Sequence, residues 1–553
     1  MTITGGKSGV AAMRFDIVAG LTAAAVVLPK AMAYATVAGL PAEVGLYTAF
    51  LPMVIYALLG TSRVLSVSST ATLAILAGTQ LGLVVPDGDP ARMVTAAATL
   101  AALVGVLLML AAVLRLGFIA NFISMPVLTG FKAGIGLVIV LDQLPKLLGV
   151  HISKHGFFPD LLSLLQQLPM TSWSTLAVAV VTLLLLLGMD RLWPHSPAPL
   201  VAVAGGIAAS WWLGLQAAGV ATVGVIPQGL PSLTLPDLAL VQQLLPGALG
   251  IALMSFTESI AAGRACANRT DPPINANREL IATGLANLGG AFFGAMPAGG
   301  GTSQSNVVRA VGGRTQKASL VTAGVAVATM LLFAPLLGLL PYATLATVVI
   351  VYSIGLIQPA EFMAIRKVRS MEFRWALIAC LGVLVFGTLQ GIVVAIIVSL
   401  LGLASQAVNP VVHVLARKPG ADVLRPLSSK YPQDETFEGL LILRPEGRLF
   451  FANAAQVHER IKALISQYQP RVVTLDLSRV PDIEFTALQM LVESEKRLGE
   501  SNITLWLAGL NPPVLKAVRE IGLADRLGRE RMLFSVHGAI DRFCALDAGT
   551  AAS

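Results

Sequence analysis

The sequence predicts an α-helical membrane protein that ends in a small α/β domain. Apolar residues fill 55% of the 553 positions and charged residues only 12%, and the mean hydropathy is +0.77. Soluble globular proteins are far less apolar. Beyond about position 406 the composition becomes polar and charged. We therefore expect most of the chain to lie in lipid and its last part to lie outside it.

Twelve stretches are apolar over enough residues to cross a bilayer, whose hydrocarbon core needs about 20 residues per helix. They lie near 15–34, 44–59, 91–114, 122–143, 172–189, 199–216, 244–262, 278–296, 318–339, 341–357, 373–389 and 391–406. Two further segments, 66–83 and 302–311, contain Ser, Thr, Gly and Gln and are too polar for ordinary lipid-facing spans. Together they predict 14 transmembrane segments, which fit a 7+7 inverted repeat.

The two interrupted segments occupy corresponding places in the two halves of the sequence. Such pairs indicate the binding site of a transporter, where half-helices meet near the middle of the membrane. An even number of crossings puts both termini on one side, and the Lys and Arg residues of loops 264–278 and 366–374 place that side in the cytoplasm. The same loops explain the formal charge of +8 without a nucleic-acid partner.

Several other kinds of protein are excluded. No cleavage signal accompanies the apolar start at Phe15, which is therefore predicted to be a span. Cys266, Cys380 and Cys544 are too scattered for a disulfide framework or a metal site, so no metal ion or cofactor is expected. The sequence has no phosphate-binding loop for an ATP-driven pump. Its motifs supply no nucleophile with a base and an orienting residue, which argues against an enzyme.

We divide the chain into a transmembrane domain over 1–406, a linker over 407–437 and a cytosolic domain over 438–553. The linker is rich in Pro, Ser and charged residues and contains the turn sequence Lys418-Pro419-Gly420. Beyond it, strand-like segments alternate with helical ones, which is typical of a small α/β domain.

Seven motifs resemble those of the sulfate permease (SulP) family of anion transporters, bacterial type, over nearly the whole chain. They lie at 28–35, 38–41, 45–48, 60–63, 256–260, 277–280 and 284–287. The segment 472–488 resembles the core of a STAS domain. The resemblance implies a uracil-permease-like fold, in which a core domain binds the anion and moves like an elevator against a gate domain. It also implies a homodimer in the cell inner membrane, with an unidentified cytosolic partner for the STAS domain.

The resemblance further implies that the third and tenth helices are half-helices whose N-termini meet at the anion, near Ser68 and Ser303. A helix N-terminus offers free N–H groups and about half a positive charge to an anion. The residues predicted to bind the substrate are Ser68, Ser69, Thr70, Gly301, Thr302, Ser303, Gln304 and Ser305. The alternative is that these hydroxyls bond their own backbone and that the small residues only allow close packing.

Charged residues near the predicted site suggest how transport is coupled. Several family members place an arginine after the serine that matches Ser303, whereas this chain has Gln304, which leaves room for a coupling cation. Glu258 lies inside an apolar span, where a carboxylate costs roughly 3 kcal/mol. It is the first coupling candidate, either by taking up H⁺ or by holding Na⁺. The alternatives for Glu258 are a structural hydrogen bond and an ion pair with an arginine.

Two more charged residues have less support. Glu43, between Pro41 and Gly45, is a second coupling candidate that could instead cap a helix. Lys30 follows Pro29 in the first span and could line the pathway or extend toward the membrane surface.

The expected function is secondary active transport of a small anion, with sulfate first and H⁺ or Na⁺ as the coupling ion. Moving one charge through 100 mV is worth about 2.3 kcal/mol, so a single cation offsets only half of the electrical cost of a dianion. The alternatives are a bicarbonate or dicarboxylate carrier, an uncoupled channel or exchanger, and a sensor with the STAS domain as its output.

Thr486 is the regulatory candidate in the STAS domain. It falls where the family has a phosphorylatable hydroxyl, although Glu484-Phe485-Thr486-Ala487 replaces the usual Asp-Ser-Ser-Gly run. A phosphoryl group there would add nearly two negative charges at the start of a helix. The competing interpretation is that Thr486 only caps that helix.

Overall fold

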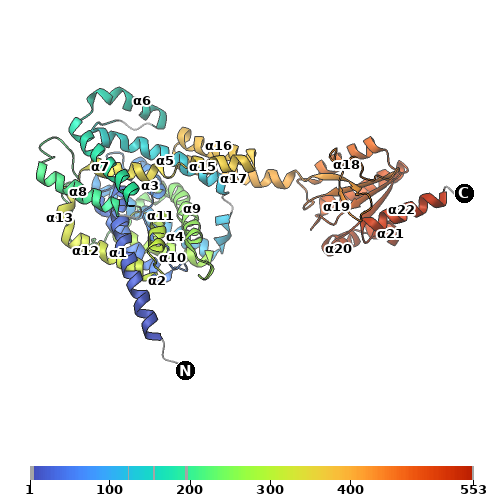
Figure 1. The fold of residues 1–553 in the computed structure, drawn as a ribbon, viewed down its shortest axis with the longest axis horizontal. Coiled ribbons are helices and arrows are strands. Elements are labelled where there is room, and N and C mark those ends of the chain that lie inside the picture. The colour runs from blue at the N-terminus through green and yellow to red at the C-terminus, as the bar shows by residue number, and fades with distance from the viewer. Residues whose placement is uncertain (1–4, 122–123, 153–155, 194–196, 551–553) are drawn as a thin grey trace. The chain divides into compact units, whose positions relative to one another are not determined.

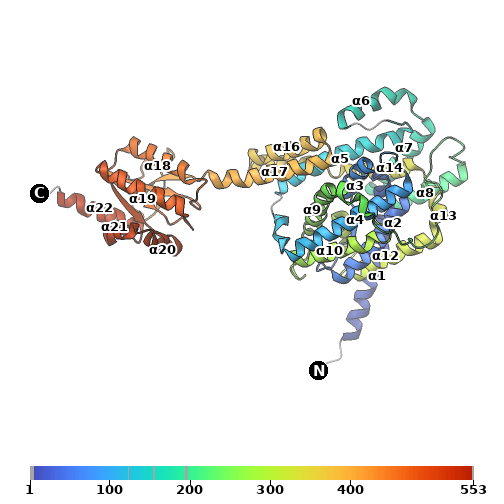
Figure 2. The ribbon, with the colours of Figure 1, turned by 180° about the vertical axis from the view of Figure 1, so that it is seen from behind.

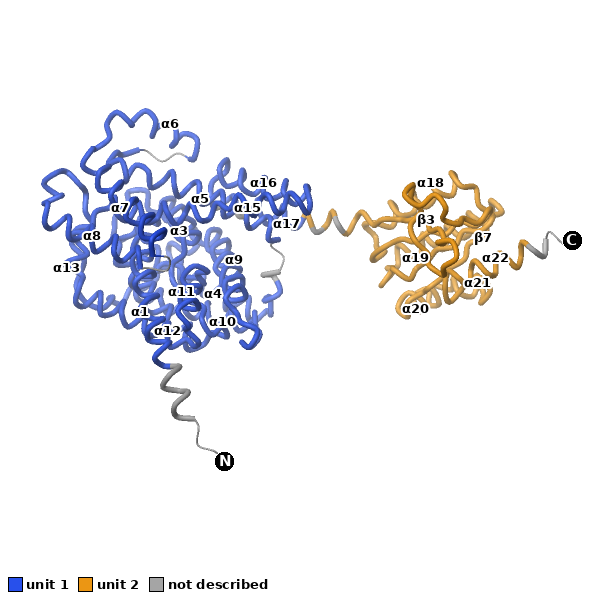
Figure 3. Tube along the Cα trace, in the orientation of Figure 1, with its two compact units in different colours: residues 1–400 blue, residues 401–553 orange. Residues whose placement is uncertain are grey.

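The computed structural model describes residues 5–121, 124–152, 156–193 and 197–550. The chain divides into two units, Met1–Leu400 and Leu401–Ser553 (Figure 3). Each unit is considered by itself below.

The first unit is helical, as predicted. Each predicted span overlaps a helix, although positions 122 and 123 lie outside the described residues. These helices are α1 (Gly5–Val37), α2 (Ala42–Leu59), α4 (Pro90–Val113), α5 (Met125–Leu148), α7 (Trp173–Leu192), α8 (Ala198–Leu213), α9 (Val241–Cys266), α10 (Ala276–Ala291), α12 (Lys317–Ala328), α14 (Tyr342–Ile354), α16 (Ser370–Phe386) and α17 (Thr388–Val408). Among the described residues, 8 helices are long and apolar enough to cross a membrane.

The two interrupted segments form a short strand followed by a short helix. The first holds β1 (Val67–Ser68) and α3 (Ala71–Val84), and the second holds β2 (Gly299–Gly300) and α11 (Thr302–Ala310). Shorter elements connect the remaining spans. They are α6 (Phe157–Gln167), α15 (Pro359–Val368) and a π-helical turn (Thr329–Phe333) that joins α12 to α13 (Ala334–Leu337).

The helices pack in two groups, in agreement with the predicted core and gate. The core group contains α1, α2, α3, α4, α9, α10, α11 and α12, and the gate group contains α5, α7, α8, α14 and α16. In both views, α4, α9 and α10 lie on one flank of the unit, away from α7 and α8 (Figure 1 and Figure 2).

Glycines allow backbones to touch within each group. A Cβ atom on Gly45 of α2 would lie 2.1 Å from the carbonyl oxygen of Ala31 in α1. A Cβ atom on Gly130 of α5 would lie 1.9 Å from that of Ala376 in α16. Small residues at such crossings let membrane helices pack by direct backbone contact, so each group is tightly packed internally.

The second unit is the expected α/β domain. Its six-stranded sheet has the order β4-β3-β5-β6-β7-β8. The strands are β3 (Val412–Arg417), β4 (Leu424–Pro426), β5 (Leu440–Pro445), β6 (Val472–Asp476), β7 (Thr504–Ala508) and β8 (Met532–Leu533). The helices are α18 (Ala454–Tyr468), α19 (Phe485–Glu500), α20 (Pro512–Glu520), α21 (Leu523–Arg531) and α22 (Val536–Thr550).

Alternation along the strands gives this sheet two buried faces. Leu441 and Leu443 of β5 pack with the α18–α21 side, whereas Leu440 and Ile442 pack with Phe543 of α22. Successive side chains of a strand point to opposite faces, so this single run of apolar residues supplies both cores.

The segment 407–437, expected to be a linker, differs from that expectation. It contains β3 and β4, and β3 pairs antiparallel with β5, so the sheet begins before position 438. The polar turn around Gly420 dominates the local composition, while Val412 and Leu415 of β3 are buried in the domain. The boundary between the two units falls within α17.

Candidate functional site

The two interrupted segments meet, and a two-residue ladder joins them. Val67 of β1 pairs antiparallel with Gly300 of β2, and Ser68 pairs with Gly299. Just beyond these strands the chain enters α3 on one side and α11 on the other. The N-termini of the two half-helices therefore lie across this ladder, each with N–H groups that have no partner inside its own helix.

Gln304 links the two segments. Its Oε1 atom accepts hydrogen bonds from Ser68 Oγ at 2.9 Å and from Ser66 Oγ at 3.4 Å. Its Nε2 atom donates to the carbonyl oxygen of Ser69 at 3.2 Å. The side chain is only 2% exposed. Gln304, predicted as a substrate ligand, thus uses its amide to hold β1 and α11 together.

Ser305 also serves the backbone. Its hydroxyl donates to the carbonyl oxygen of Gly301 at 2.7 Å and accepts from the N–H of Ser66 at 3.0 Å. The N–H of Gly301 donates to the carbonyl oxygen of Ser66 at 3.0 Å. These contacts match the alternative in which hydroxyls of this segment bond to backbone groups.

Three of the predicted ligands keep hydroxyl groups accessible or unused. Thr302 and Ser303, in the first turn of α11, are exposed. Ser69 is fully buried, and its Oγ atom has no hydrogen-bond partner in the described structure. A buried hydroxyl without a partner is costly unless a ligand or water completes it. In the described structure these three hydroxyls are therefore available to a ligand near the first turns of α3 and α11.

Glu258 lies beside the start of α3. Its Oε2 atom accepts a hydrogen bond from Thr70 Oγ1 at 3.0 Å, and Thr70 also caps α3 through the N–H of Leu73. Glu258 is 8% exposed. Within the described residues no Lys, Arg or His nitrogen lies within 4.0 Å of its carboxylate, so the ion-pair alternative finds no partner there.

Other residues of α9 hold this helix against the ladder. Ser255 Oγ donates to the carbonyl oxygen of Ala298 at 2.7 Å, and the N–H of Gly300 donates to Ser259 Oγ at 2.8 Å. Positions 255, 258 and 259 share one face of a helix because they are three and four residues apart. The same face that fixes β2 therefore presents Glu258 to the site.

The other two residues predicted from the sequence, Glu43 and Thr486, are not part of this cluster. Glu43 lies partly buried in the first turn of α2, where a carboxylate is favoured by the helix dipole, and no described hydrogen bond connects it to the site. Thr486 is exposed in the first turn of α19, whose N-cap is Glu484. The interpretation of Thr486 as the capping residue is therefore not supported.

Lys30 reaches the site from α1, a role that the sequence left open. Its Nζ atom lies 3.4 Å from Ser303 Oγ and 3.4 Å from the centre of the Tyr352 ring on α14. The side chain is 2% exposed, so it does not extend to the membrane surface. A charge inside an apolar span was the available signal, as it was for Glu258.

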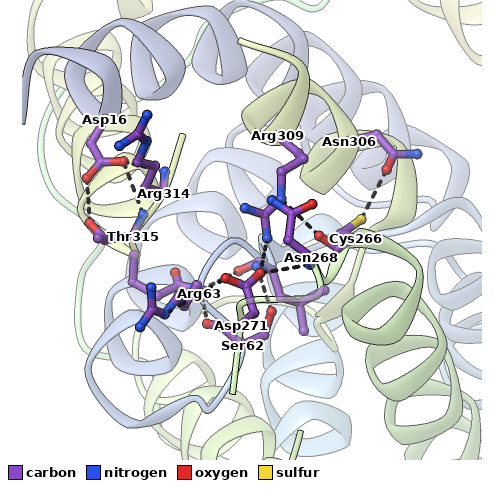
Figure 4. Close-up of polar contacts among 12 residues, drawn as sticks. Asp16, Ser62, Arg63, Cys266, Asn268, Asp271, Asn306, Arg309, Arg314 and Thr315 are labelled. Carbon is purple, nitrogen blue, oxygen red and sulfur yellow. Dashed lines mark hydrogen bonds and ion pairs between the residues drawn. The ribbon is translucent and has the colours of Figure 1, made fainter. Parts of the chain in front are cut away.

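A charged cluster anchors the far end of α11 (Figure 4). Arg309 donates to the carbonyl oxygen of Cys266 at 2.9 Å and pairs with Asp271. Burial raises the pKa of the Asp271 carboxyl, but the N–H of Asn268 and the guanidinium groups of Arg309 and Arg63 lower it by more. The pKa of this carboxyl therefore lies below its usual value. The C-terminal end of α11 is thus tied to the α9–α10 loop while its N-terminus faces the site.

Asp16 fixes the chain just after α11 (Figure 4). One carboxylate oxygen accepts from the N–H groups of Arg314 at 2.7 Å and Thr315 at 3.1 Å, and the other accepts from Thr315 Oγ1 at 2.5 Å. Gln316 then donates to the carbonyl oxygens of Ser62 at 2.8 Å and Leu65 at 2.9 Å. Both ends of α11 are therefore positioned by the core group.

The chain is similar to known transporters over almost its full length. The sulfate permease family model matches residues 13–379, and the STAS domain model matches residues 431–539. A probable sulfate transporter of Mycobacterium tuberculosis is 34% identical over 535 residues, which is 96% of this chain and 95% of that protein. Sulfate transporter 4.1, chloroplastic, of Arabidopsis thaliana is 29% identical over 548 residues, covering 95% of this chain and 79% of that protein.

Two solved structures share the fold. Murine Solute Carrier 26 family member A9, an anion transporter in the inward-facing state, aligns with a TM-score of 0.87 at 22% identity, covering 96% of this chain and 91% of that chain. The transmembrane domain of the cyanobacterium bicarbonate transporter BicA aligns with a TM-score of 0.62 at 24% identity, covering 70% of this chain and 97% of that chain.

Proposed function

We propose, given that the chain belongs to the sulfate permease family, that it carries sulfate across the cell inner membrane by secondary active transport. The observation that carries this proposal is the meeting of two half-helix N-termini, across β1 and β2, next to a buried carboxylate. Sulfate is the first candidate because relatives that span nearly the whole chain are named sulfate transporters.

The anion is proposed to bind between the first turns of α3 and α11. Ser69, Thr302 and Ser303 are its proposed direct ligands, because their hydroxyls are accessible or lack a partner in the described structure. Unpaired N–H groups and the dipoles of both helices add donors and positive potential without a mobile charge. Ser68, Thr70, Gly301, Gln304 and Ser305 shape this site through the contacts described above.

Glu258 is proposed to couple anion movement to a cation. An ionised carboxylate this close to the start of α3 repels an anion unless it binds H⁺ or a Na⁺ ion lies beside it. One cation of either kind offsets about 2.3 of the roughly 4.6 kcal/mol that a dianion requires per 100 mV. Sulfate uptake into a negative-inside cell therefore needs a second cation or a steep gradient.

The site is proposed to move as one body. The elements that build it, β1, α3, α9, β2 and α11, are held together by hydrogen bonds within the core group. Movement of the core group past the gate group would carry the bound anion from one side to the other without remaking these bonds. This motion is the elevator-like alternating access expected from the sequence.

The test is uptake of labelled sulfate by the purified chain in liposomes with imposed H⁺ or Na⁺ gradients. Bicarbonate and fumarate serve as competitors. Glu258→Gln and Glu43→Gln separate the two coupling candidates, and Glu372→Gln, a partly exposed carboxylate in the gate group, is the matched control. We expect gradient-driven accumulation that Glu258→Gln abolishes and Glu372→Gln retains.

Other outcomes identify the alternatives. Sulfate flux that ignores both gradients and the Glu258 substitution indicates an uncoupled exchanger or channel. Uptake of bicarbonate or fumarate in preference to sulfate indicates a carrier for one of those anions. The absence of flux for every anion favours a sensor.

Topology, oligomeric state and regulation complete the proposal. The basic loops support cytoplasmic termini, and a homodimer is proposed from the resemblance. Thr486 is proposed as a regulatory site because its exposed hydroxyl lies in the first turn of α19. A phosphoryl group there would interact with the helix dipole and with Arg448, which pairs with neighbouring Glu484. Mass spectrometry of the native protein, with Thr486→Ala as control, tests for this modification.

A further inference from the structure

Lys30 is a buried amine for which the described structure offers no acidic partner. No carboxylate oxygen of the described residues lies within 4.0 Å of its Nζ atom. Its contacts are the hydroxyl of Ser303 at 3.4 Å and the face of the Tyr352 ring, whose centre is 3.4 Å away. An ammonium group has three donors, and neither partner carries a negative charge.

This arrangement is unusual for a residue with only a structural role. A buried charge is stable when it is paired and hydrogen-bonded, and leaving it unpaired costs several kcal/mol. An ammonium over an aromatic face recovers about 2 kcal/mol or more when both are out of water. The ring therefore offsets only part of the cost, so a bound anion would further stabilise a charged Lys30.

Such an anion would have a defined place. Ser303, which Lys30 contacts, is exposed in the first turn of α11, one of the two half-helices whose N-termini meet across β1 and β2. Gln304, the next residue, is neutral, and its amide already bonds to Ser68 and Ser69. The positive charge that this position lacks is available from Lys30 on the neighbouring helix α1.

We infer that Lys30 supplies the positive charge of the anion site, and that the Tyr352 ring holds its ammonium group until the anion binds. The inference rests on the proposed function and specifies the chemistry of that site. It assigns a ligand of the substrate, Lys30, and a competing partner for that ligand, Tyr352. The favoured substrate is an oxyanion that accepts a hydrogen bond from an ammonium group.

The contact between Lys30 and Tyr352 joins the core group to the gate group, so its loss affects how the two groups move. Lys30 is on α1 of the core group, whereas Tyr352 is on α14 of the gate group. The cation–π contact therefore bridges the two groups that must slide past each other. When a bound anion takes over the ammonium group, this bridge weakens, and the loaded core group is easier to move. Binding of substrate is thus linked to release of the core from the gate.

The experiment measures sulfate binding to the full-length purified chain by titration calorimetry, together with the KM for uptake in liposomes. Lys30→Gln keeps a donor of similar length but removes the charge, and we expect sulfate to bind at least about tenfold more weakly. Lys30→Arg keeps the charge and is expected to stay within about threefold of the unmodified chain. A monovalent anion such as bicarbonate should lose less affinity than sulfate in Lys30→Gln.

Tyr352 is tested by a matched pair of substitutions. Tyr352→Phe retains the aromatic face and should bind sulfate as the unmodified chain does. Tyr352→Leu removes the competing partner of the ammonium group, so sulfate should bind about threefold to tenfold more tightly. Equal melting temperatures across the set exclude general unfolding as the cause.

Each outcome has a distinct meaning. If Lys30→Gln binds sulfate as tightly as the unmodified chain, or loses sulfate and bicarbonate binding equally, the charge assignment is overturned. If Tyr352→Leu leaves the dissociation constant unchanged, the competing role of the ring is overturned. If the unmodified chain binds and carries no anion at all, the proposed function itself fails. The variants test only the roles of Lys30 and Tyr352, so the two failures can be told apart.

Discussion

Two buried carboxylates of the core group are satisfied to very different degrees. Glu279 of α10 is 0% exposed. It accepts hydrogen bonds from Tyr56 Oη at 2.8 Å, from the N–H of Thr61 at 2.7 Å and from Thr61 Oγ1 at 2.5 Å. Among the described contacts, Glu258 accepts one hydrogen bond, from Thr70 Oγ1 at 3.0 Å. Glu279 is complete without a ligand, and Glu258 is not.

The number of fixed hydrogen-bond donors around each carboxylate distinguishes a structural glutamate, Glu279, from a candidate functional one, Glu258. A buried carboxylate is stable when fixed donors surround it, as the end of α2 and the loop after it surround Glu279. A carboxylate that must bind and release a cation in every cycle has to keep part of its capacity free. Composition alone does not distinguish the two, since both are glutamates within largely apolar helices, whereas the number of fixed donors does.

The largest expected effect is on stability, at Glu279. Replacing Glu279 with Ala leaves the Tyr56 hydroxyl and the Thr61 N–H buried without an acceptor, and each unpaired group costs about 1–3 kcal/mol. We expect a loss of about 3 kcal/mol in unfolding free energy, measured by thermal unfolding in detergent. Glu279→Gln keeps one acceptor oxygen and should lose less. A Glu279→Ala protein that melts like the unmodified chain would contradict the assignment.

Glu258 should respond in the opposite way. Glu258→Gln can still accept the hydrogen bond from Thr70, so unfolding free energy should change by less than about 1 kcal/mol. The gradient-driven accumulation of sulfate should fall at least about tenfold, because the amide binds neither H⁺ nor Na⁺ effectively. Parallel unfolding and liposome measurements on the same preparation check both. If Glu258→Gln lost stability but kept gradient-driven accumulation, Glu258 would be a structural residue like Glu279.

The spans were predictable because lipid requires long apolar helices, and the interrupted pair stood out by its Ser, Thr and Gly content. β3 was missed because a six-residue strand next to a polar turn gives a weak compositional signal. The π-helical turn at Thr329–Phe333 has no evident signal in its apolar sequence.

Within the site, the sequence identified the polar residues but not which of them hold the structure together and which remain free to bind a ligand. Gln304 was expected to bind the substrate, yet its amide is occupied by Ser68 and Ser69. The approach of Lys30 to Tyr352 depends on two helices more than 300 positions apart, which no local pattern contains. Contacts of this range follow from packing, and packing decides which polar groups remain free.

A smaller effect distinguishes the free hydroxyls from the engaged ones. Ser69 Oγ has no partner in the described structure, so Ser69→Ala removes an unsatisfied group and should leave unfolding free energy within about 0.5 kcal/mol. Sulfate affinity should fall by a few-fold if the hydroxyl contacts the anion. Ser305→Ala is the matched control, because it removes two structural hydrogen bonds and should lower stability first. Equal affinity in Ser69→Ala and the unmodified chain would remove Ser69 from the ligands.

The smallest expected effect is a pH dependence at the other end of α11. The pKa of Asp271 is lowered in the folded chain, so its ionised form contributes stability above the unfolded value of about 3.9. That contribution is lost as the pH falls through the lower folded pKa, because the protonated carboxyl no longer pairs with Arg309. Asp271→Asn should therefore flatten the loss of stability in acid below about pH 4, measured by thermal unfolding across a pH series. Asp87→Asn, which breaks an exposed pair with Arg92, should leave that curve unchanged. An equal change in both variants would mean that the cluster holds α11 no more firmly than an ordinary surface ion pair.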